Sequence, residues 1–375
     1  MATDALLRWE ENGETLEAPF ISLRGRSAPS RATVADDTLT ADAAFRLVSQ
    51  GTAILWRGDF VNARQLLAAL ARRVDARLKV TSDPQHPEAS FHSWRQTQAQ
   101  RATLLSLLLV PVAAGIVPLP RAPDVADALS DAFGPLPDRA AMPLRDLVTA
   151  QSAAEWRRRG VPIAALDGAK VHPHFGVFPP TRQDYIDLVA KVPLPSAELA
   201  YDLGTGSGVL ATVLLHRGIK QVIATDISPA AIASATEAFG QLGYAGRTQV
   251  VAGALYPEGR AGLIVCNPPW LPGKAGTALE AAVYDPDSAM LRVFLDGLQS
   301  HLEPGGEGWL VISDIAERLG LRRPGELEAM IAAAGLTVAG RLNAPPAPKG
   351  ARDQGDPLHF ARSKEVVSLW RLRAA

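Results

Sequence analysis

The sequence predicts an α/β fold whose larger part is a Rossmann-like, doubly wound sheet of seven strands with an antiparallel last strand. Two observations lead to this prediction. From residue 199 onward, short apolar strands alternate with helices, as they do in parallel sheets covered by helices on both faces. Near the C-terminus, two strand-like segments at 337–342 and 366–371 lie close together, which indicates an antiparallel hairpin at the sheet edge.

The elements of this sheet follow one another in a regular order. A helix at 185–192 precedes the first strand. The expected strands are 199–203, 221–226, 249–251, 263–266, 309–313, 337–342 and 366–371. The expected helices between them are 209–216, 229–242, 288–302 and 326–334. A long proline-containing loop at 343–357 is expected either to close over a substrate or to be disordered.

The length of the chain indicates a second, smaller domain before this sheet. At 375 residues the chain exceeds the usual size of one domain. We place the boundary near residue 165, with an N-terminal substrate-recognition domain at 1–165 and a second domain at 166–375. The N-terminal domain is expected to be a mainly helical α+β domain.

The N-terminal elements are less regular. The first forty residues are mixed and poorly periodic, and their beginning is expected to be loosely ordered. A strand is expected at 52–56, and a buried helix that runs into a buried strand at 104–119. Helices are expected at 41–49, 61–77, 94–110, 124–133 and 140–159.

Composition narrows the class of protein. Hydrophobic residues make up 47% of the chain and charged residues 21%, with a net charge of -1, so the basic surplus typical of duplex nucleic-acid binding is missing. The first residues do not resemble a secretory signal, and the apolar run at 104–119 is too short for a bilayer. A cytoplasmic protein is the expectation. The single cysteine, Cys266, excludes an internal disulfide and a multi-cysteine metal site, and no metal site is expected.

The most specific motif is Asp202-Leu-Gly-Thr-Gly-Ser-Gly208, which ends a strand and opens a helix. The glycines let the backbone turn sharply and let a ligand approach without meeting a side chain. The spacing G-x-G-x-G differs from the dinucleotide fingerprint G-x-G-x-x-G, which places a pyrophosphate on the helix N-terminus. Because a carboxylate stands beside the turn, an ammonium group fits this place better than an anion does.

The next strand ends at Asp226, where a carboxylate is well placed to accept hydrogen bonds from a ribose diol. The alternative is that Asp226 caps the helix that starts at Pro229.

A second motif, Asn267-Pro-Pro-Trp270, ends the fourth strand. The two prolines fix the backbone and leave carbonyl groups near the corner free to accept hydrogen bonds. The side-chain carbonyl of Asn267 and the main-chain carbonyl of Pro268 are suited to hold both hydrogens of an amide or exocyclic amino group, and Trp270 is suited to stack on the flat substrate. The alternative is a turn with a core tryptophan.

Together these motifs resemble class I S-adenosylmethionine-dependent methyltransferases, in the branch that carries an (Asn/Asp)-Pro-Pro-aromatic corner. That branch includes protein-glutamine N5-methyltransferases, ribosomal-RNA guanine-N2 methyltransferases and adenine-N6 methyltransferases. The resemblance covers about residues 170–375 and implies S-adenosyl-L-methionine as the cofactor. The cofactor-binding residues implied are Asp202, Gly204, Thr205, Gly206, Gly208, Asp226, Ile227 and Asn267. The catalytic residues implied are Asn267, Pro268, Pro269 and Trp270.

Two departures from the family pattern concern the cofactor pocket. Where an acid is expected after the third strand, this chain has residues 253–255 without one, so the adenine contacts are left open. Where the glutamine methyltransferases have a Pro-Arg segment, this chain has Pro179 and Pro180. His172 and His174 nearby are interpreted as loop residues rather than metal ligands.

The expectation is therefore an S-adenosylmethionine-dependent N-methyltransferase whose acceptor is an RNA base or a protein glutamine. A small-molecule acceptor is a further alternative. A non-catalytic cofactor-binding module and a nucleotide-dependent oxidoreductase are the rivals from other classes. No membrane partner is expected, and the sequence does not indicate an oligomeric state.

Overall fold

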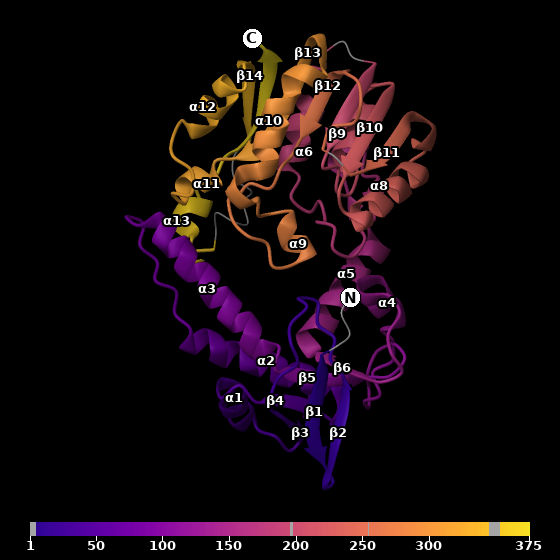
Figure 1. Cartoon of the computed structure of the whole chain (residues 1–375), viewed down its shortest axis with the longest axis vertical. Helices are drawn as coiled ribbons and strands as arrows, with labels where there is room; N and C mark the ends of the chain where they lie inside the picture. Colours follow the sequence, from indigo (N-terminus) through magenta and orange to yellow (C-terminus); the bar gives the residue numbers. More distant parts are fainter. Residues whose placement is uncertain (1–4, 196–197, 254, 345–352) are drawn as a thin grey trace. The chain divides into compact units, whose positions relative to one another are not determined.

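The computed structural model of the protein describes residues 5–195, 198–253, 255–344 and 353–375. The chain divides into two compact units, drawn in Figure 1. The first unit consists of Met1–Thr81 and His92–Glu155, and the second of Ser82–Phe91 and Trp156–Ala375. The domain limits expected from the sequence, 1–165 and 166–375, stay a proposal. Most of the loop expected at 343–357 lies outside the described residues.

The second unit contains the predicted seven-stranded sheet, whose strand order is β11-β10-β9-β12-β13-β15-β14. Its strands are β9 (Leu199–Leu203), β10 (Gln221–Asp226), β11 (Thr248–Ala252), β12 (Ala261–Cys266), β13 (Leu302–Ser313), β14 (Leu336–Ala344) and β15 (Val367–Ala374). The strands β9 to β13 pair in parallel, while β15 runs antiparallel to both of its neighbours. The doubly wound sheet with an antiparallel last strand is therefore confirmed.

Helices cover both faces of this sheet, as Figure 1 shows. One face packs against α6 (Asp184–Lys191), α7 (Val209–His216) and α8 (Pro229–Gln241), and the other against α10 (Ala289–His301) and α12 (Glu326–Ala333). Every residue of β12 is buried, as expected for a central parallel strand between two helical layers.

The remaining elements of the second unit are short and lie around this sheet. They are β7 (Val161–Pro162), η1 (Ala164–Leu166), β8 (Lys170–Val171), η2 (Ala245–Arg247), α9 (Ala278–Ala281), η3 (Pro286–Ser288), α11 (Ile315–Arg318) and α13 (His359–Arg362).

The first unit begins with a hairpin that the sequence-based assignment missed. Strands β1 (Leu6–Glu11) and β2 (Glu14–Pro19) pair antiparallel across Asn12 and Gly13, which both have positive φ. Asn-Gly is the pair that favours the tight turn of such a hairpin. No strand was assigned to the first forty residues from the sequence, because they are poorly periodic.

A four-stranded sheet with the order β3-β4-β5-β6 forms the centre of the first unit. Its strands are β3 (Ala32–Ala35), β4 (Ala53–Trp56), β5 (Leu108–Val112) and β6 (Ala140–Pro143). The helices associated with it are α1 (Ala41–Ser49), α2 (Phe60–Arg77), α3 (Pro87–Leu105), α4 (Ala126–Phe133) and α5 (Leu144–Arg159). The helix expected at 140–159 was wrong in its first four residues, which form β6 instead.

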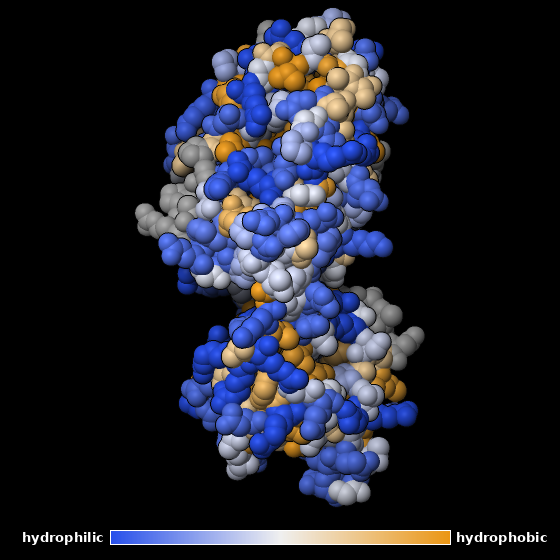
Figure 2. All heavy atoms as spheres, turned by 90° about the vertical axis from the view of Figure 1, so that its left-hand side faces the viewer, coloured by the Kyte–Doolittle hydropathy of each residue, from blue (hydrophilic) through white to orange (hydrophobic). Residues whose placement is uncertain are grey.

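The surface is mostly hydrophilic on the face shown in Figure 2, where apolar residues form small groups. Within the described parts of the chain, no helix combines the length and the apolar character that crossing a membrane requires.

Candidate functional site

The strand register brings the two sequence motifs to the same edge of the sheet. Leu203 at the end of β9 pairs with Thr225 of β10 on one side and with Cys266 of β12 on the other. The residues that follow on these strands are Gly204, Asp226 and Asn267. Because all three strands run in parallel, these residues stand next to one another at the carboxyl edge, where ligands bind in open α/β sheets.

The glycine turn after β9 needs its glycines for two different reasons. Gly204, Gly206 and Gly208 have φ values of 71°, 55° and 78°, a region that other residues rarely adopt. A Cβ added at Gly208 would fall 3.1 Å from Cα of Ala235, so this glycine lets α8 pack closely. A Cβ added at Gly206 would meet nothing within 4 Å. The open space therefore lies at the middle glycine.

Asp202 stands below the turn and is only 1% exposed. One of its carboxylate oxygens accepts hydrogen bonds from Oγ1 of Thr205 at 2.7 Å and from the backbone N–H of Ala211 at 3.0 Å. Burial raises the pKa of Asp202 to about 6, although these hydrogen bonds act in the opposite direction. Asp202 thus ties the turn to the first turn of α7 and keeps a negative charge beneath the glycines at neutral pH.

Asp226 is bonded to the same turn from the neighbouring strand. Its carboxylate accepts from the backbone N–H of Gly206 at 3.0 Å and from that of Ser228 at 2.8 Å. The cap of α8 is Ser228, whose side chain accepts from Ala231, so Asp226 is not the N-cap. The next residue, Ile227, is 83% exposed and offers an apolar side chain beside the turn.

The Asn-Pro-Pro-Trp corner is closed by a hydrogen bond inside the motif. Nε1 of Trp270 donates to Oδ1 of Asn267 at 2.9 Å. A carbonyl oxygen has two lone pairs, so Asn267 retains one for a further donor. Asn267 is half-buried and Pro268 is buried.

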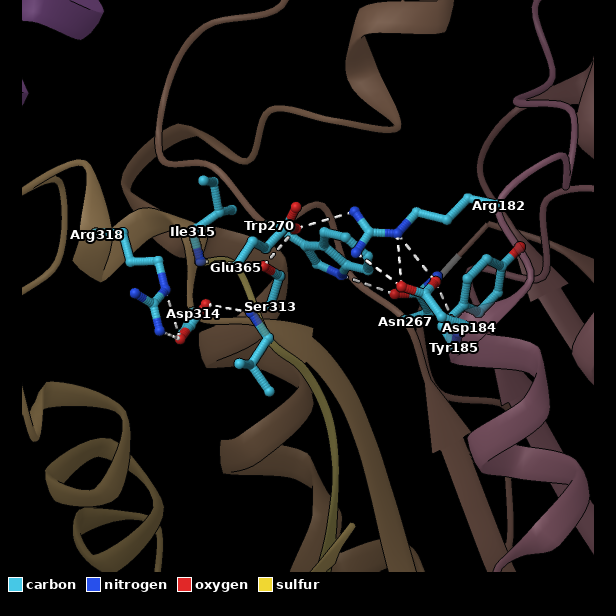
Figure 3. A network of polar contacts seen from close by, with 11 residues as sticks. Arg182, Asp184, Tyr185, Asn267, Trp270, Ser313, Asp314, Ile315, Arg318 and Glu365 are labelled. Atoms are coloured by element: carbon cyan, nitrogen blue, oxygen red, sulfur yellow. Dashed lines mark hydrogen bonds and ion pairs between the residues drawn. The ribbon is translucent and has the colours of Figure 1, made fainter. Parts of the chain in front are cut away.

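A cation also covers Trp270. The guanidinium carbon of Arg182 lies 5.0 Å from the centre of the indole ring, and the two side chains meet in Figure 3. The sequence predicted Trp270 as a stacking surface but did not indicate Arg182 as its partner. One face of the indole is therefore already taken by a residue of this chain.

Two carboxylates hold Arg182 in this position. Its Nε donates to Asp184 at 2.9 Å and its Nη1 donates to Glu365 at 3.0 Å. Glu365 also accepts from Oγ of Ser313 at 2.6 Å, at the end of β13 (Figure 3). Burial acts against the charge of Arg182, but the two carboxylates outweigh it and raise the pKa of the guanidinium above its ordinary value.

The described residues contain no group of three or more metal-ligating side chains that fits a metal ion. Of the two loop histidines, His174 contacts Glu237 through Nε2 at 2.6 Å, and His172 contacts the carbonyl of Arg157 through Nδ1 at 2.6 Å. The residues that contact the adenine are not assigned, because residue 254, in the segment after the third strand, lies outside the described residues.

The edge as a whole suits a ligand that combines a cationic part with an uncharged ribose and ring. Gly206 leaves space above the turn, Asp202 and Asp226 supply negative charge, and Ile227 supplies an exposed apolar side chain. S-adenosylmethionine carries an ammonium and a sulfonium group and lacks phosphates, so this set of residues fits it better than it fits a dinucleotide.

Comparison with known proteins agrees with this assignment. Residues 168–321, which lie in the second unit, match the family model described as methyltransferase small domain. The release factor glutamine methyltransferase of Cereibacter sphaeroides is 38% identical over 120 residues, which is 28% of this chain and 43% of that protein. The protein of the same name from Moorella thermoacetica is 35% identical over 174 residues, which is 42% of this chain and 61% of that protein. The ribosomal protein L11 methyltransferase of Pelotomaculum thermopropionicum is 48% identical over 69 residues, which is 18% of this chain and 22% of that protein.

These matches span less than two thirds of each relative.

Proposed function

We propose that this protein is an S-adenosylmethionine-dependent methyltransferase that acts on an amide or exocyclic amino nitrogen of a macromolecule. The observation that carries the proposal is the strand register, which brings Gly204, Asp226 and Asn267 to the carboxyl ends of three adjacent parallel strands. A glycine turn, a ribose-type acid and a carbonyl-rich corner therefore share one edge of the sheet.

The cofactor half of the site is assigned to the turn and to β10. Gly204, Gly206 and Thr205 would face the methionine part and Asp226 the ribose, while Ile227 would pack against the adenine. Asp202 is buried under the turn, and we assign it the role of setting the turn's shape and charge. When bound, the cofactor supplies an electrophilic methyl group on a positively charged sulfur.

The acceptor half of the site is assigned to the corner after β12. Because Trp270 already occupies one lone pair of Oδ1 of Asn267, one acceptor position is left on the side chain. The second hydrogen of an acceptor NH2 group is assigned to the carbonyl of Pro268. Two fixed acceptors orient the nitrogen, and such alignment contributes several kcal/mol to catalysis.

We further propose that the acceptor belongs to a protein. Carboxylates predominate at this edge. Asp202, Asp226 and Asp285 lie near the ends of the strands, and Arg182 offsets only part of the charge of Asp184 and Glu365. Negative charge at this density opposes a phosphate backbone. The relatives named above are methyltransferases of release factors and of a ribosomal protein, which agrees with a protein acceptor and a cytoplasmic location.

The first unit is proposed to recognise the acceptor macromolecule. An RNA base is the rival acceptor, because the first unit contains Arg24, Arg26, Arg101 and Arg145, whose charges act on one another. Asp146 is buried within this group and offsets part of its charge.

Methyl transfer into cell extract tests the proposal. Extract from a strain without this protein is incubated with the purified protein and S-adenosylmethionine labelled in the methyl group. The label is then challenged with protease or with nuclease. Release by protease supports a protein acceptor, release by nuclease shows RNA, and label in the low-molecular-weight fraction shows a small-molecule acceptor.

Asn267→Ala separates catalysis from simple cofactor binding. We expect methyl transfer to fall by about 100-fold or more, since the acceptor nitrogen loses an orienting oxygen. The affinity for S-adenosylhomocysteine, measured by titration calorimetry, is expected to change little. Unchanged methyl transfer would favour a non-catalytic binding module. Binding of NAD in place of S-adenosylhomocysteine would favour an oxidoreductase.

A further inference from the structure

Arg182 belongs to a network that reaches the proposed acceptor corner from two distant parts of the chain. It precedes α6 in the sequence, and its partner Glu365 precedes β15, whereas Trp270 follows β12. Figure 3 shows the guanidinium next to the indole, with the carboxylates of Glu365 and Asp184 on its two sides. The network therefore joins three separate segments of the second unit beside Asn267.

The guanidinium has little freedom to move. The side chains of Asp184 and Glu365 are 13% and 12% exposed, and both bind it. Glu365 is fixed in turn by Ser313, and Asp184 also accepts from the backbone N–H of Tyr185. Since both partners are themselves anchored, Arg182 is held at one place over the indole.

The position of the indole decides which way the Asn267 amide points. An indole N–H only donates, so the atom of Asn267 that faces Trp270 is the oxygen Oδ1 and not the Nδ2 group. The last torsion of an asparagine has two broad, nearly equivalent orientations, and a fixed donor selects one of them. If the indole moved, the amide would be free to turn its NH2 group toward the acceptor.

We propose that Arg182 is a positioning residue that holds Trp270 so that the indole fixes the Asn267 amide with its oxygen available to an incoming NH2 group. The catalytic role in this inference rests on the proposed function, whereas the arrangement of the side chains is independent of it. An amide turned the other way would present donors to a donor, which removes the orienting hydrogen bond.

Lysine is not equivalent to arginine at this place. A guanidinium is planar, stacks on an aromatic face and presents several donors in a fixed fork, whereas an ammonium group is a compact and strongly hydrated charge. Arg182→Lys therefore keeps the charge between Asp184 and Glu365 but loses the stacking. The chain also offers a matched control, because Arg341 lies 4.2 Å from the ring centre of Trp370 on β14 and β15, at the far edge of the sheet.

The first test observes the Trp270 side chain directly and requires no acceptor substrate. Indole N–H signals are recorded by ¹⁵N NMR, and that of Trp270 is assigned with Trp270→Phe. We expect Arg182→Lys to shift this signal and to speed its exchange with water, while Arg341→Lys leaves it in place. An unchanged Trp270 signal in Arg182→Lys would overturn the inference, whatever the enzyme acts on.

The second test measures kcat and KM of methyl transfer to the acceptor fraction of the cell extract. We expect Arg182→Lys to lower kcat by about 10- to 100-fold, with the KM for S-adenosylmethionine and the S-adenosylhomocysteine affinity changed less than about twofold. Arg341→Lys is expected to keep the wild-type kcat. Equal kcat values for Arg182→Lys and wild type would overturn the inference. Absence of methyl transfer by the wild type would instead refute the proposed function and leave the NMR result to decide this inference.

A variant with milder consequences guards against misfolding. Glu365→Gln leaves Arg182 and its other partner in place and removes one charge from the clamp. Its effect on the Trp270 signal and on kcat is expected to be smaller and in the same direction. A folded Glu365→Gln protein with wild-type NMR and kinetics, together with an unfolded Arg182→Lys protein, would show a purely structural role and overturn the inference.

Discussion

Two carboxylates in the same sheet are buried to the same degree but have opposite surroundings. Asp202 on β9 is 1% exposed and receives hydrogen bonds from neutral donors, so burial raises its pKa to about 6. Glu307 on β13 is fully buried, yet Arg371, Trp309 and Arg373 outweigh burial and lower its pKa to about 2. Partners, and not burial alone, decide the charge of a buried acid.

The difference separates a binding region from a structural one. The hydrogen bonds described for the Asp202 carboxylate come from neutral donors, so no cation among them offsets its negative charge at the carboxyl edge. In the β13–β15 ladder, Glu307 receives hydrogen bonds from Arg371 at 2.6 Å and from Arg373 at 2.6 Å. We therefore expect changes in the ladder to alter stability and changes at the edge to alter binding.

The largest expected effect is on the structural side. Glu307→Gln leaves two arginines facing a neutral side chain in the sheet. Because their side chains are 23% and 52% exposed, we expect a loss of about 3 kcal/mol, the low end of the range for breaking a buried ion pair. Chemical denaturation should show this loss, while the S-adenosylhomocysteine affinity of the folded protein stays the same. Glu303→Gln, at an exposed position of the same strand, is the control and should change stability by about 0.5 kcal/mol or less. Equal stability of the two variants would contradict the assignment of Glu307.

The next effect is on the binding side. Asp226→Asn replaces the carboxylate proposed for the ribose hydroxyls, and a hydrogen bond to a charged group contributes about 1.5–3 kcal/mol. We expect the S-adenosylhomocysteine affinity to fall by about 10- to 100-fold in titration calorimetry. Asp167→Asn, at an acid whose side chain is 89% exposed, should leave affinity unchanged. A wild-type affinity in Asp226→Asn would show that this acid does not hold the cofactor.

The glycine turn allows the same contrast within three residues. Gly208→Ala combines a positive φ with a close approach to α8, so it should destabilise the protein by about 1–2 kcal/mol or more. Gly206→Ala has the positive φ but open space around it, and its added methyl group should weaken S-adenosylhomocysteine binding relative to its effect on stability. Gly208→Ala should therefore lower the unfolding free energy, measured by denaturation, more than the S-adenosylhomocysteine affinity, measured by calorimetry. Gly206→Ala should do the opposite. If both variants lost stability and affinity in the same proportion, the two glycines would not have the different roles assigned here.

The smallest and most specific effect concerns pH. The folded pKa of Asp202 lies above its unfolded value, so its contribution to stability falls as pH rises from about 4 to about 6. The folded pKa of Glu307 lies below its unfolded value, so its contribution falls as pH decreases from about 4.5 to about 2. Unfolding free energies measured across pH should lose the first slope in Asp202→Asn and the second in Glu307→Gln. Parallel curves for both variants would contradict these shifts.

Much of the sheet was predictable because its strands and helices alternate with clear periodicity. The hairpin of β1 and β2 was missed because the first forty residues are poorly periodic, although Asn12-Gly13 favours its tight turn. Strand β6 was assigned to a helix because a four-residue apolar run has no periodicity that separates the two.

The site was predictable at its motifs and not at its contacts. Asp202 and Asp226 were identified, but the bonds of both to the turn depend on the fold. Arg182 was missed because Trp270 and Glu365 are distant from it in sequence, and no local spacing links them. The closure of Asn267 by its own tryptophan likewise required the side-chain positions.

A crystal structure with S-adenosylhomocysteine bound would test the central claim most directly. The account predicts that the sulfur atom lies between the glycine turn at Gly204 and the corner at Asn267, with the ribose on Asp226. A complex in which the sulfur faces a cavity that Asn267 does not border would contradict it.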